Sequence, residues 1–376
     1  MISRAEVDKL LSLRAREPSV LSLYLWVPLD PAELRGLPAR VDELFALAAR
    51  GGTGIRGTAG VQASDRQGIR ALLAGRGRDW LGHTVAIFSS AELGLAEAVP
   101  LPCRLQDRAV LGARPHVRPL LAALQYCPAY RVVVVDRRHA WLFAVTGEDI
   151  ATTTLPPADG LRSHGFSGWY GLQAYRVNDR IIELARHHYH EVAALLERAV
   201  RVGGPQPLVI GGHQDTVAQF LAVVPAGIRD QVAGRFGADP HALTAARVRD
   251  LAGCVIADWV TARGHDLAAQ ILQRPPDGLT ATGLAACLAA AGQHAIELLL
   301  APAAGLVPGY ACQHCGALST TPSGCPHGPE ASLAVPDLIE EIVVSTLADG
   351  GRVETLADPP AGIAGRLRFE PTRQTL

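Results

Sequence analysis

A long amphipathic stretch in the middle of the chain constrains the fold most tightly. From about Gln173 to Arg201 apolar residues recur at helical intervals, and the charged residues fall mainly between them. This spacing predicts one helix of about seven or eight turns, closed by the sequence Gly203-Gly204-Pro205. The helix is preceded by the glycine-rich run HGFSGWYGLQAYR, residues 164–176.

Short β-like runs flank this helix on both sides. Residues 131–135 and 140–145 are predicted to form a hairpin, and residues 152–155 form a further strand. Asp136, between the first two strands, is favoured as a turn residue over a nuclease metal ligand, because two-metal nucleases need several acids at one site. After the helix, residues 207–212 read as a strand that runs through two glycines into another helix. Such a turn can bind phosphate, but the GxGxxG and Walker patterns are absent, and an ordinary tight turn is favoured.

The two ends of the chain also alternate between strand and helix patterns. The first part predicts strands at 20–27 and 83–90, with helices and a glycine-rich loop at 51–60 between them. The last part predicts helical residues at 240–274, broken by Gly253 and Gly264. It continues with a helix-to-strand segment at 283–301, a helix at 337–351 and the strand RVETL. The predicted class is therefore α/β.

Length and composition bound the remaining possibilities. A chain of 376 residues, with 48% hydrophobic and 19% charged residues, predicts two or three globular units. No run is apolar enough to span a bilayer, and the first residues lack a signal peptide, which predicts a cytoplasmic protein that contacts no membrane. A formal net charge of −1 means that any contact with RNA has to be local.

The segment CQHCGALSTTPSGCPHG, residues 312–328, carries the sharpest local signal. Cys312 and Cys315 have the spacing of a zinc knuckle, and Cys325 with His327 supplies a second pair across a loop. Four protein ligands predict a structural Zn²⁺ site, in which His314 is a competing ligand. The alternatives are a cluster of reduced thiols and a degraded, empty motif.

Catalytic motifs of the common hydrolases are missing. We find no nucleophile elbow, no Ser/His/Asp order and no HExxH. His187 and His190 share one helix face without a completing ligand, so a solvated surface is favoured there. No small-molecule cofactor is expected.

The order of hairpin, glycine-containing loop, long basic helix and strand resembles the central domain of the archaeal and eukaryotic class I peptide chain release factors. Gly171, Leu172 and Gln173 match the GGQ position, Ala174 the small residue after it, and Arg176 the following arginine. The last part of the chain is similar to the C-terminal domain of that family, so the resemblance covers about residues 128–370. It is closest to a bacterial branch related to Pelota-like rescue factors and to the eukaryotic peptidyl-tRNA hydrolase of stalled large subunits.

The resemblance implies three domains. These are an N-terminal α/β domain (1–127), a central RNase H-like domain with the loop and long helix (128–250), and a C-terminal α/β sandwich with a zinc-binding insertion (251–376, insertion 312–328).

The resemblance also implies a mechanism for hydrolysis of the peptidyl-tRNA ester. A mobile loop would use Gln173, with Gly168 and Gly171, to orient a water molecule at the ester. The implied partners are the ribosome and the tRNA acceptor end, with side chains that contact phosphates or stack on a base: Arg162, Arg176, Arg180, Trp169 and Tyr170.

Two departures from the family pattern bear on this activity. Leu172 stands where the family has its second glycine, and the first part of the chain contains no NIKS-like codon-reading sequence. Three hypotheses follow: a ribosome-associated peptidyl-tRNA hydrolase, which the retained Gln173 favours; a non-catalytic hibernation or stress factor in the ribosomal A site; and a zinc-stabilised α/β protein with an unrelated partner.

Overall fold

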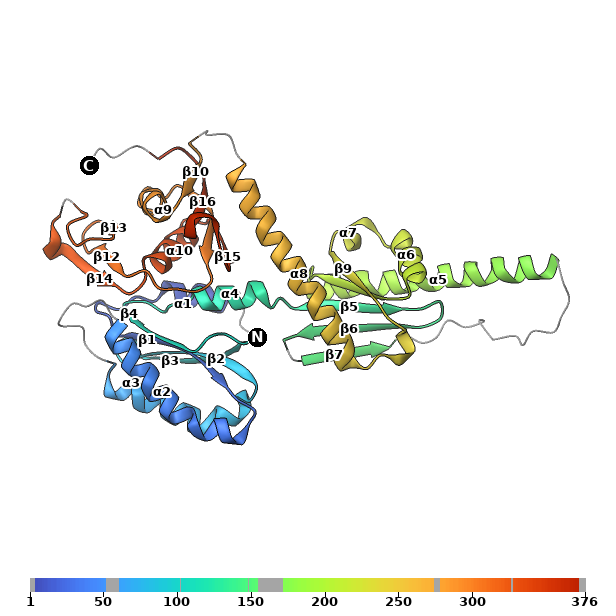
Figure 1. Cartoon of the computed structure of the whole chain (residues 1–376), viewed down its shortest axis with the longest axis horizontal. Helices are drawn as coiled ribbons and strands as arrows, with labels where there is room; N and C mark the ends of the chain where they lie inside the picture. The colour runs from blue at the N-terminus through green and yellow to red at the C-terminus, as the bar shows by residue number, and fades with distance from the viewer. Residues whose placement is uncertain are drawn as a thin grey trace. The chain divides into compact units, whose positions relative to one another are not determined.

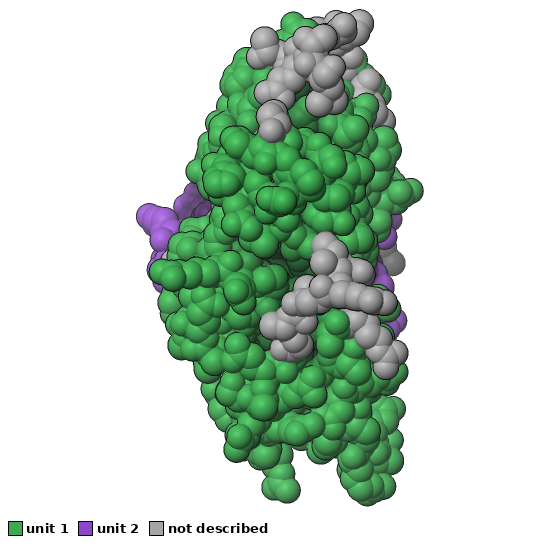
Figure 2. All heavy atoms as spheres, turned by 90° about the vertical axis from the view of Figure 1, so that its left-hand side faces the viewer, with its two compact units in different colours: residues 1–126, 264–376 green, residues 127–263 purple. Residues whose placement is uncertain are grey.

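The computed structural model describes residues 4–51, 61–101, 103–147, 149–154, 172–273, 278–325 and 327–371. The chain divides into two compact units (Figure 2). Unit 1 contains residues 1–126 and 264–376, and unit 2 contains residues 127–263. Unit 1 is therefore assembled from the two ends of the chain, and unit 2 is the segment between them.

Unit 1 contains a four-stranded antiparallel sheet in the order β3-β2-β1-β4 (Figure 1). The elements of this segment are α1 (Arg4–Ser12), β1 (Val20–Val27), α2 (Pro31–Gly51), α3 (Ala63–Arg76), the short helix η1 (Gly77–Trp80), β2 (His83–Ser90), β3 (Leu95–Leu101), β4 (Arg108–Gly112) and α4 (Arg118–Tyr126). The side chains of β1 alternate between the two faces of the sheet and pack into two separate hydrophobic cores. Leu21, Leu23 and Leu25 pack with Phe45 of α2, whereas Tyr24 packs in the core formed with the end of the chain.

The second half of unit 1 is built on another four-stranded sheet, in the order β10-β16-β11-β15. A three-stranded sheet, β13-β12-β14, lies in the insertion between β11 and α10. The elements are β10 (Thr280–Thr282), α9 (Leu284–Ala291), β11 (Ile296–Pro302), β12 (Gly309–Cys312), β13 (Leu318–Ser319), η3 (Pro329–Ala331), β14 (Ser332–Val335), α10 (Leu338–Ala348), β15 (Arg352–Leu356), η4 (Pro360–Gly362) and β16 (Ala364–Leu367). Its helices α9 and α10 share the large core that contains Tyr24, so the two ends of the chain belong to one compact unit.

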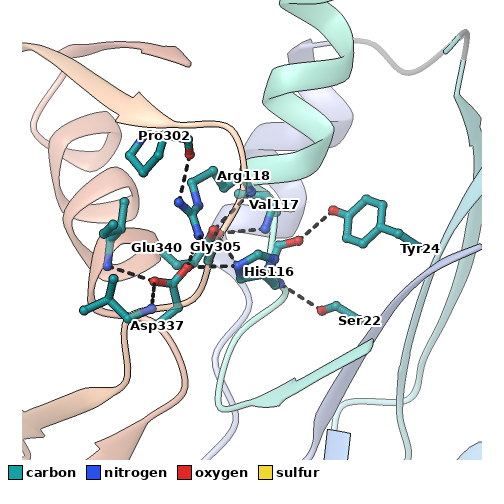
Figure 3. Close-up of polar contacts among 11 residues, drawn as sticks. Ser22, Tyr24, His116, Val117, Arg118, Pro302, Gly305, Asp337 and Glu340 are labelled. Atoms are coloured by element: carbon teal, nitrogen blue, oxygen red, sulfur yellow. Dashed lines mark hydrogen bonds and ion pairs between the residues drawn. The ribbon is translucent and has the colours of Figure 1, made fainter. Parts of the chain in front are cut away.

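A buried polar network joins the two ends of the chain inside unit 1 (Figure 3). The Arg118 guanidinium donates to Asp337 Oδ2 at 2.5 Å and to the carbonyl oxygen of Pro302 at 2.8 Å. The Glu340 carboxylate accepts hydrogen bonds from the main-chain N–H groups of Val117 and Arg118, at 2.7 and 3.1 Å. Because these charges are buried and paired, they fix how the two halves of unit 1 pack.

His116 extends the same network toward the first sheet. Its Nε2 atom lies 3.1 Å from Asp337 Oδ2, and its main-chain N–H donates to Ser22 Oγ at 2.9 Å. The Tyr24 hydroxyl donates to the carbonyl oxygen of His116 at 2.6 Å. The network therefore runs from β1 through His116 to the N-terminus of α10 (Figure 3).

Unit 2 is a five-stranded mixed sheet with helices on both faces. The strand order is β7-β6-β5-β8-β9; β5, β6 and β7 are antiparallel neighbours, and β8 and β9 run parallel to β5. The elements are β5 (Tyr130–Val135), β6 (Ala140–Thr146), β7 (Asp149–Thr154), α5 (Leu172–Gly203), β8 (Leu208–Gly212), α6 (Gln214–Val223), α7 (Ala226–Arg229), β9 (Val232–Gly237) and η2 (Pro240–Ala242). The helix α8 (Ala245–Leu272) begins in unit 2 and ends in unit 1.

Alternation along β5 explains the two covered faces of this sheet. Val133 and Val135 pack with α5 and α6, whereas Val132 and Val134 pack with α8. A strand that is buried on both faces reads as a continuous apolar run, as RVVVV does.

The prediction of breaks at Gly253 and Gly264 is wrong, because α8 continues through both glycines. A glycine costs a helix only about 1 kcal/mol relative to alanine. Burial of Val248, Ala252 and Ile256 against the sheet offsets that cost. Tertiary packing therefore overrides the local signal.

Several edge strands were not recognised in the sequence, β3 and β9 among them. β3 contains Pro100 and β9 contains two glycines, and both features weaken a strand signal while being tolerated at the edge of a sheet. Among the described residues, no helix combines the length and the apolar character that a bilayer crossing requires.

Candidate functional site

The helix that follows the glycine-rich loop begins at Leu172. The predicted loop residues Gly168, Trp169, Tyr170, Gly171 and Arg162 lie outside the described residues. Gln173 is therefore in the first turn of α5, where main-chain N–H groups have no partner within the helix. Arg176 and Arg180 also lie in α5, and their side chains are outside the described part of the structure.

The later part of α5 packs firmly on unit 2. Ala185, Tyr189, Val192 and Leu196 are buried in the core between α5, α6 and the sheet. These residues follow the helical spacing that the sequence predicts, with Ile182 exposed at 56% before them. The packed section therefore anchors the helix whose first turn contains Gln173.

The four predicted metal ligands of the insertion come together in unit 1. Cys312 ends β12, Cys315 lies in the turn to β13, and Cys325 and His327 lie between β13 and β14. The turn is closed by a hydrogen bond from the N–H of Gly316 to the carbonyl oxygen of Cys312, at 2.9 Å. Gly316 has φ +72°, a conformation that a side chain disfavours, so the sequence C-x-x-C-G suits this knuckle.

The donor atoms lie as close together as the ligands of one tetrahedral ion, or slightly closer. The sulfur atoms of Cys315 and Cys325 lie 3.2 Å apart, and His327 Nδ1 lies 3.6 Å from Cys312 Sγ and 3.3 Å from Cys325 Sγ. All four donor atoms lie within 4.8 Å of one another. Zinc bonds of about 2.3 Å to sulfur and 2.0–2.1 Å to nitrogen would hold tetrahedral ligands roughly 3.6–3.8 Å apart. His314, the competing candidate, is not among the four.

Electrostatics at the cluster also favour a cation. Main-chain N–H groups of Cys315 and His314 hydrogen-bond Cys312 and lower the pKa of its thiol to about 6. At Cys325, the N–H of His327 lowers the pKa, but the neighbouring Cys315 and Cys312 outweigh it and raise that pKa to about 11. Adjacent thiolates repel, so the cluster ionises fully only with a positive ion among them. The Cys₃His set could thus hold a metal, with no position left open for a substrate.

Two further groups of possible ligands were not recognised in the sequence. His116, Asp337 and Glu340 lie close together, but the Arg118 guanidinium already supplies the positive charge there. Asp136, His139 and His241 form the other group. Asp136 acts as a turn residue, as predicted, because its Oδ1 atom accepts from the N–H groups of Arg138 and His139. His241 lies too far along the chain for any spacing motif to reveal it.

Comparisons with known proteins agree with the resemblance. Residues 115–273, which include all of unit 2 and make up less than half of the chain, match the family model described as bacterial archaeo-eukaryotic release factor family 10. No curated protein sequence matches the chain.

Several solved structures are similar at low identity. An archaeal translation termination factor, aRF1, is 16% identical over 98% of this chain and 99% of its own, with a TM-score of 0.24. Pelota of Archaeoglobus fulgidus is 14% identical over 77% of this chain and 80% of its own, with a TM-score of 0.36. Dom34 of S. cerevisiae is 12% identical over 79% and 83%, with a TM-score of 0.42. The match of residues 115–273 supports the resemblance of this chain to the archaeo-eukaryotic release factors that its sequence indicates.

Proposed function

We propose that this chain is a translation factor that binds the ribosome in the manner of a release factor and occupies the A site without cutting the peptidyl-tRNA ester. The family match over residues 115–273 supports a role in translation. The observation that favours a non-hydrolytic role is the start of α5 at Leu172. A ribosome-binding hibernation or stress factor fits both features and would work in the cytoplasm.

The backbone at the GGQ-like position, Gly171-Leu172-Gln173, favours a non-hydrolytic role. In the family two consecutive glycines free the loop to approach the tRNA end closely, whereas Leu172 carries a Cβ and is already helical. Gln173 is then fixed on a helix rather than carried by a flexible loop. A water molecule must be oriented accurately at the ester carbon, so a displaced glutamine loses most of its catalytic effect.

Hydrolysis is the second candidate, and the retained Gln173 favours it. Free N–H groups in the first turn of α5 and the positive end of the helix dipole would favour an oxyanion. In this case Gln173, with Gly168 and Gly171, positions the water.

Both candidates use the same contacts with RNA. We propose that Arg162, Arg176 and Arg180 contact phosphates of the acceptor end, and that Trp169 and Tyr170 stack on a base. Stop-codon reading is not part of either proposal, because a NIKS-like sequence is absent from the chain.

The strand arrangement of unit 2 supports the finer architecture. We propose that this unit is the RNase H-like central domain, since its first strand β5 is central, the next two follow as antiparallel neighbours, and the last two are parallel to it. The division into domains 1–127, 128–250 and 251–376, with a Zn²⁺-binding insertion at 312–328, belongs to the same proposal.

Cosedimentation with ribosomes tests the proposed function. We expect the wild-type protein and Gln173→Ala to sediment equally with ribosomes, and binding to weaken steeply as salt rises, because phosphate contacts release counterions. Neither protein is expected to release peptide from stalled peptidyl-tRNA. Peptide release that Gln173→Ala abolishes would establish the hydrolase instead. Failure to bind any ribosomal state would exclude both candidates.

A further inference from the structure

Three ligand-type side chains meet at one edge of the sheet of unit 2. Asp136 directly follows β5, His139 lies in the turn before β6, and His241 lies in η2, after β9. Because β5, β8 and β9 are parallel, their carboxyl ends lie at the same edge. Ligands of open α/β sheets commonly bind at this edge.

Hydrogen bonds fix the carboxylate of Asp136 with one oxygen directed at the histidines. Its Oδ1 atom accepts from the N–H groups of Arg138 and His139, at 2.6 and 2.5 Å. Its Oδ2 atom lies 3.3 Å from His139 Nδ1 and 2.7 Å from His241 Nε2. The turn therefore holds one carboxylate oxygen and leaves the other for a shared partner.

Packing holds the two imidazole rings in place. The ring of Trp141 stacks on His139, with centroids 5.8 Å apart and planes at 22°. The same indole meets the His241 ring edge to face, at 5.7 Å and 87°. The ring of His188, on α5, is buried beside the main chain of His139. An ordered environment of this kind orients ligands before an ion arrives.

We propose that Asp136, His139 and His241 form a second metal site, which takes a divalent transition ion such as Zn²⁺. Their donor atoms lie within 4.8 Å of one another. Zinc bonds of about 2.0–2.2 Å to nitrogen and oxygen place tetrahedral ligands about 3.3 Å apart. The Asp136–His139 separation has this value, and the Asp136–His241 separation needs a small outward movement of His241, whose side chain is 60% exposed.

This site differs in kind from the Cys₃His cluster. Two imidazoles and one carboxylate supply three ligands and leave a coordination position for water or for an oxygen of a bound molecule. A cavity of about 180 Å³ has Trp141 and His241 in its lining, together with apolar residues such as Phe143 and Leu243. A ligand of the ion therefore has space beside it.

Zinc binding to the full-length protein tests the proposal. Metal-free protein, prepared under reducing conditions, is titrated with Zn²⁺ in a calorimeter and its bound zinc is measured after dialysis. We expect about two equivalents for the wild type, one at each site. The variants His241→Gln and His139→Gln are expected to bind about one equivalent, with the second affinity at least about tenfold weaker, since even outer-sphere losses cost about 10–100-fold.

Two further variants separate this site from other sources of zinc binding. His187→Gln removes an exposed histidine of the same unit, on α5 beside Glu191, and should keep both equivalents. Cys312→Ser should lose the equivalent at the Cys₃His cluster and keep the one at Asp136. Asp136→Asn keeps an oxygen for the turn but loses the charge, and should behave as His241→Gln does. Zinc binding that is the same in the wild type and in both histidine variants would show that Asp136 and His241 only contact each other and hold no ion.

Discussion

The Oδ2 atom of Asp337 lies 2.5 Å from the Nη2 atom of Arg118, a residue 219 positions earlier in the sequence. Neither side chain is exposed to solvent. Asp337 also caps α10, because its Oδ1 atom accepts from the N–H of Ile339 at 3.2 Å. One carboxylate thus caps the N-terminus of a helix in the last third of the chain and pairs with an arginine from the first third.

Breaking this pair should destabilise unit 1 strongly. Arg118→Met leaves the Asp337 carboxylate buried without its guanidinium partner, which costs about 3–5 kcal/mol in free energy of unfolding. Hydrogen exchange of the α10 amides in increasing urea measures that change in unit 1. The matched control is Arg366→Met, because Arg366 pairs with Glu297 at a partly exposed position, where a loss of about 0–1 kcal/mol is expected. Equal effects of the two substitutions would contradict the structural role of the buried pair.

The same carboxylate should make unit 1 sensitive to acid. Burial alone would raise the pKa of Asp337, but the hydrogen bond from His116 and the charge of Arg118 outweigh it and lower that pKa. The stabilisation is therefore complete above the unfolded-state pKa of about 3.9 and is lost as the pH falls through the lower folded-state pKa. The unfolding free energies of wild type and Asp337→Asn should converge below about pH 4. A constant difference down to the acid limit would contradict this.

Glu341 should act in the opposite sense. Burial raises the pKa of this carboxyl group, so its contribution is present below the unfolded-state pKa of about 4.3 and is lost as the pH rises through the folded-state value. Glu341→Gln should therefore gain stability relative to the wild type between weakly acidic and neutral pH. Thermal unfolding across this range measures the difference, and a variant that loses stability there would show that the charged form is favoured.

Among the cysteines, only those of the Cys₃His cluster should affect the zinc content of the protein. Cys312→Ser is expected to lower bound zinc by about one equivalent and to destabilise the β12–β14 insertion, since a structural ion contributes directly to folding. Cys254→Ser, which changes an exposed thiol of α8, should leave the zinc content unchanged. Elemental analysis of the purified proteins measures both. Unchanged zinc in Cys312→Ser would rule out the Cys₃His site.

The two glycines of α8 should respond differently to alanine. At Gly253 the nearest atom to an added Cβ is the Tyr130 hydroxyl, at 3.9 Å, so Gly253→Ala should gain about 0.5–1 kcal/mol from helix propensity. At Gly264 a Cβ would come within 2.7 Å of a Leu356 methyl group, which must move. Gly264→Ala should therefore gain less or lose stability. Urea unfolding of both variants measures the two changes in stability. A larger gain for Gly264→Ala than for Gly253→Ala would contradict the prediction.

Several features could be predicted from the sequence because their causes are local. The apolar spacing of 173–201 depends on residues three and four apart, and α5 covers Leu172–Gly203. The strands at 20–27 and 83–90 are likewise local, and their alternation places side chains on both faces of the sheet. The four Cys/His ligands lie within a short segment, so their spacing in the sequence was enough to predict that they form one cluster. The loop before Leu172 stays a prediction, since residues 155–171 lie outside the described residues.

The tertiary structure decided the features that join distant segments. Arg118 meets Asp337, and His241 meets Asp136, only after separate strands and helices have packed. Tertiary packing also kept α8 continuous through Gly253 and Gly264, because burial of the apolar residues of α8 outweighs the low helix propensity of the two glycines. The physical reason is range: propensity and periodicity act over a few residues, whereas the pairing of buried charges depends on how whole sheets and helices pack against one another.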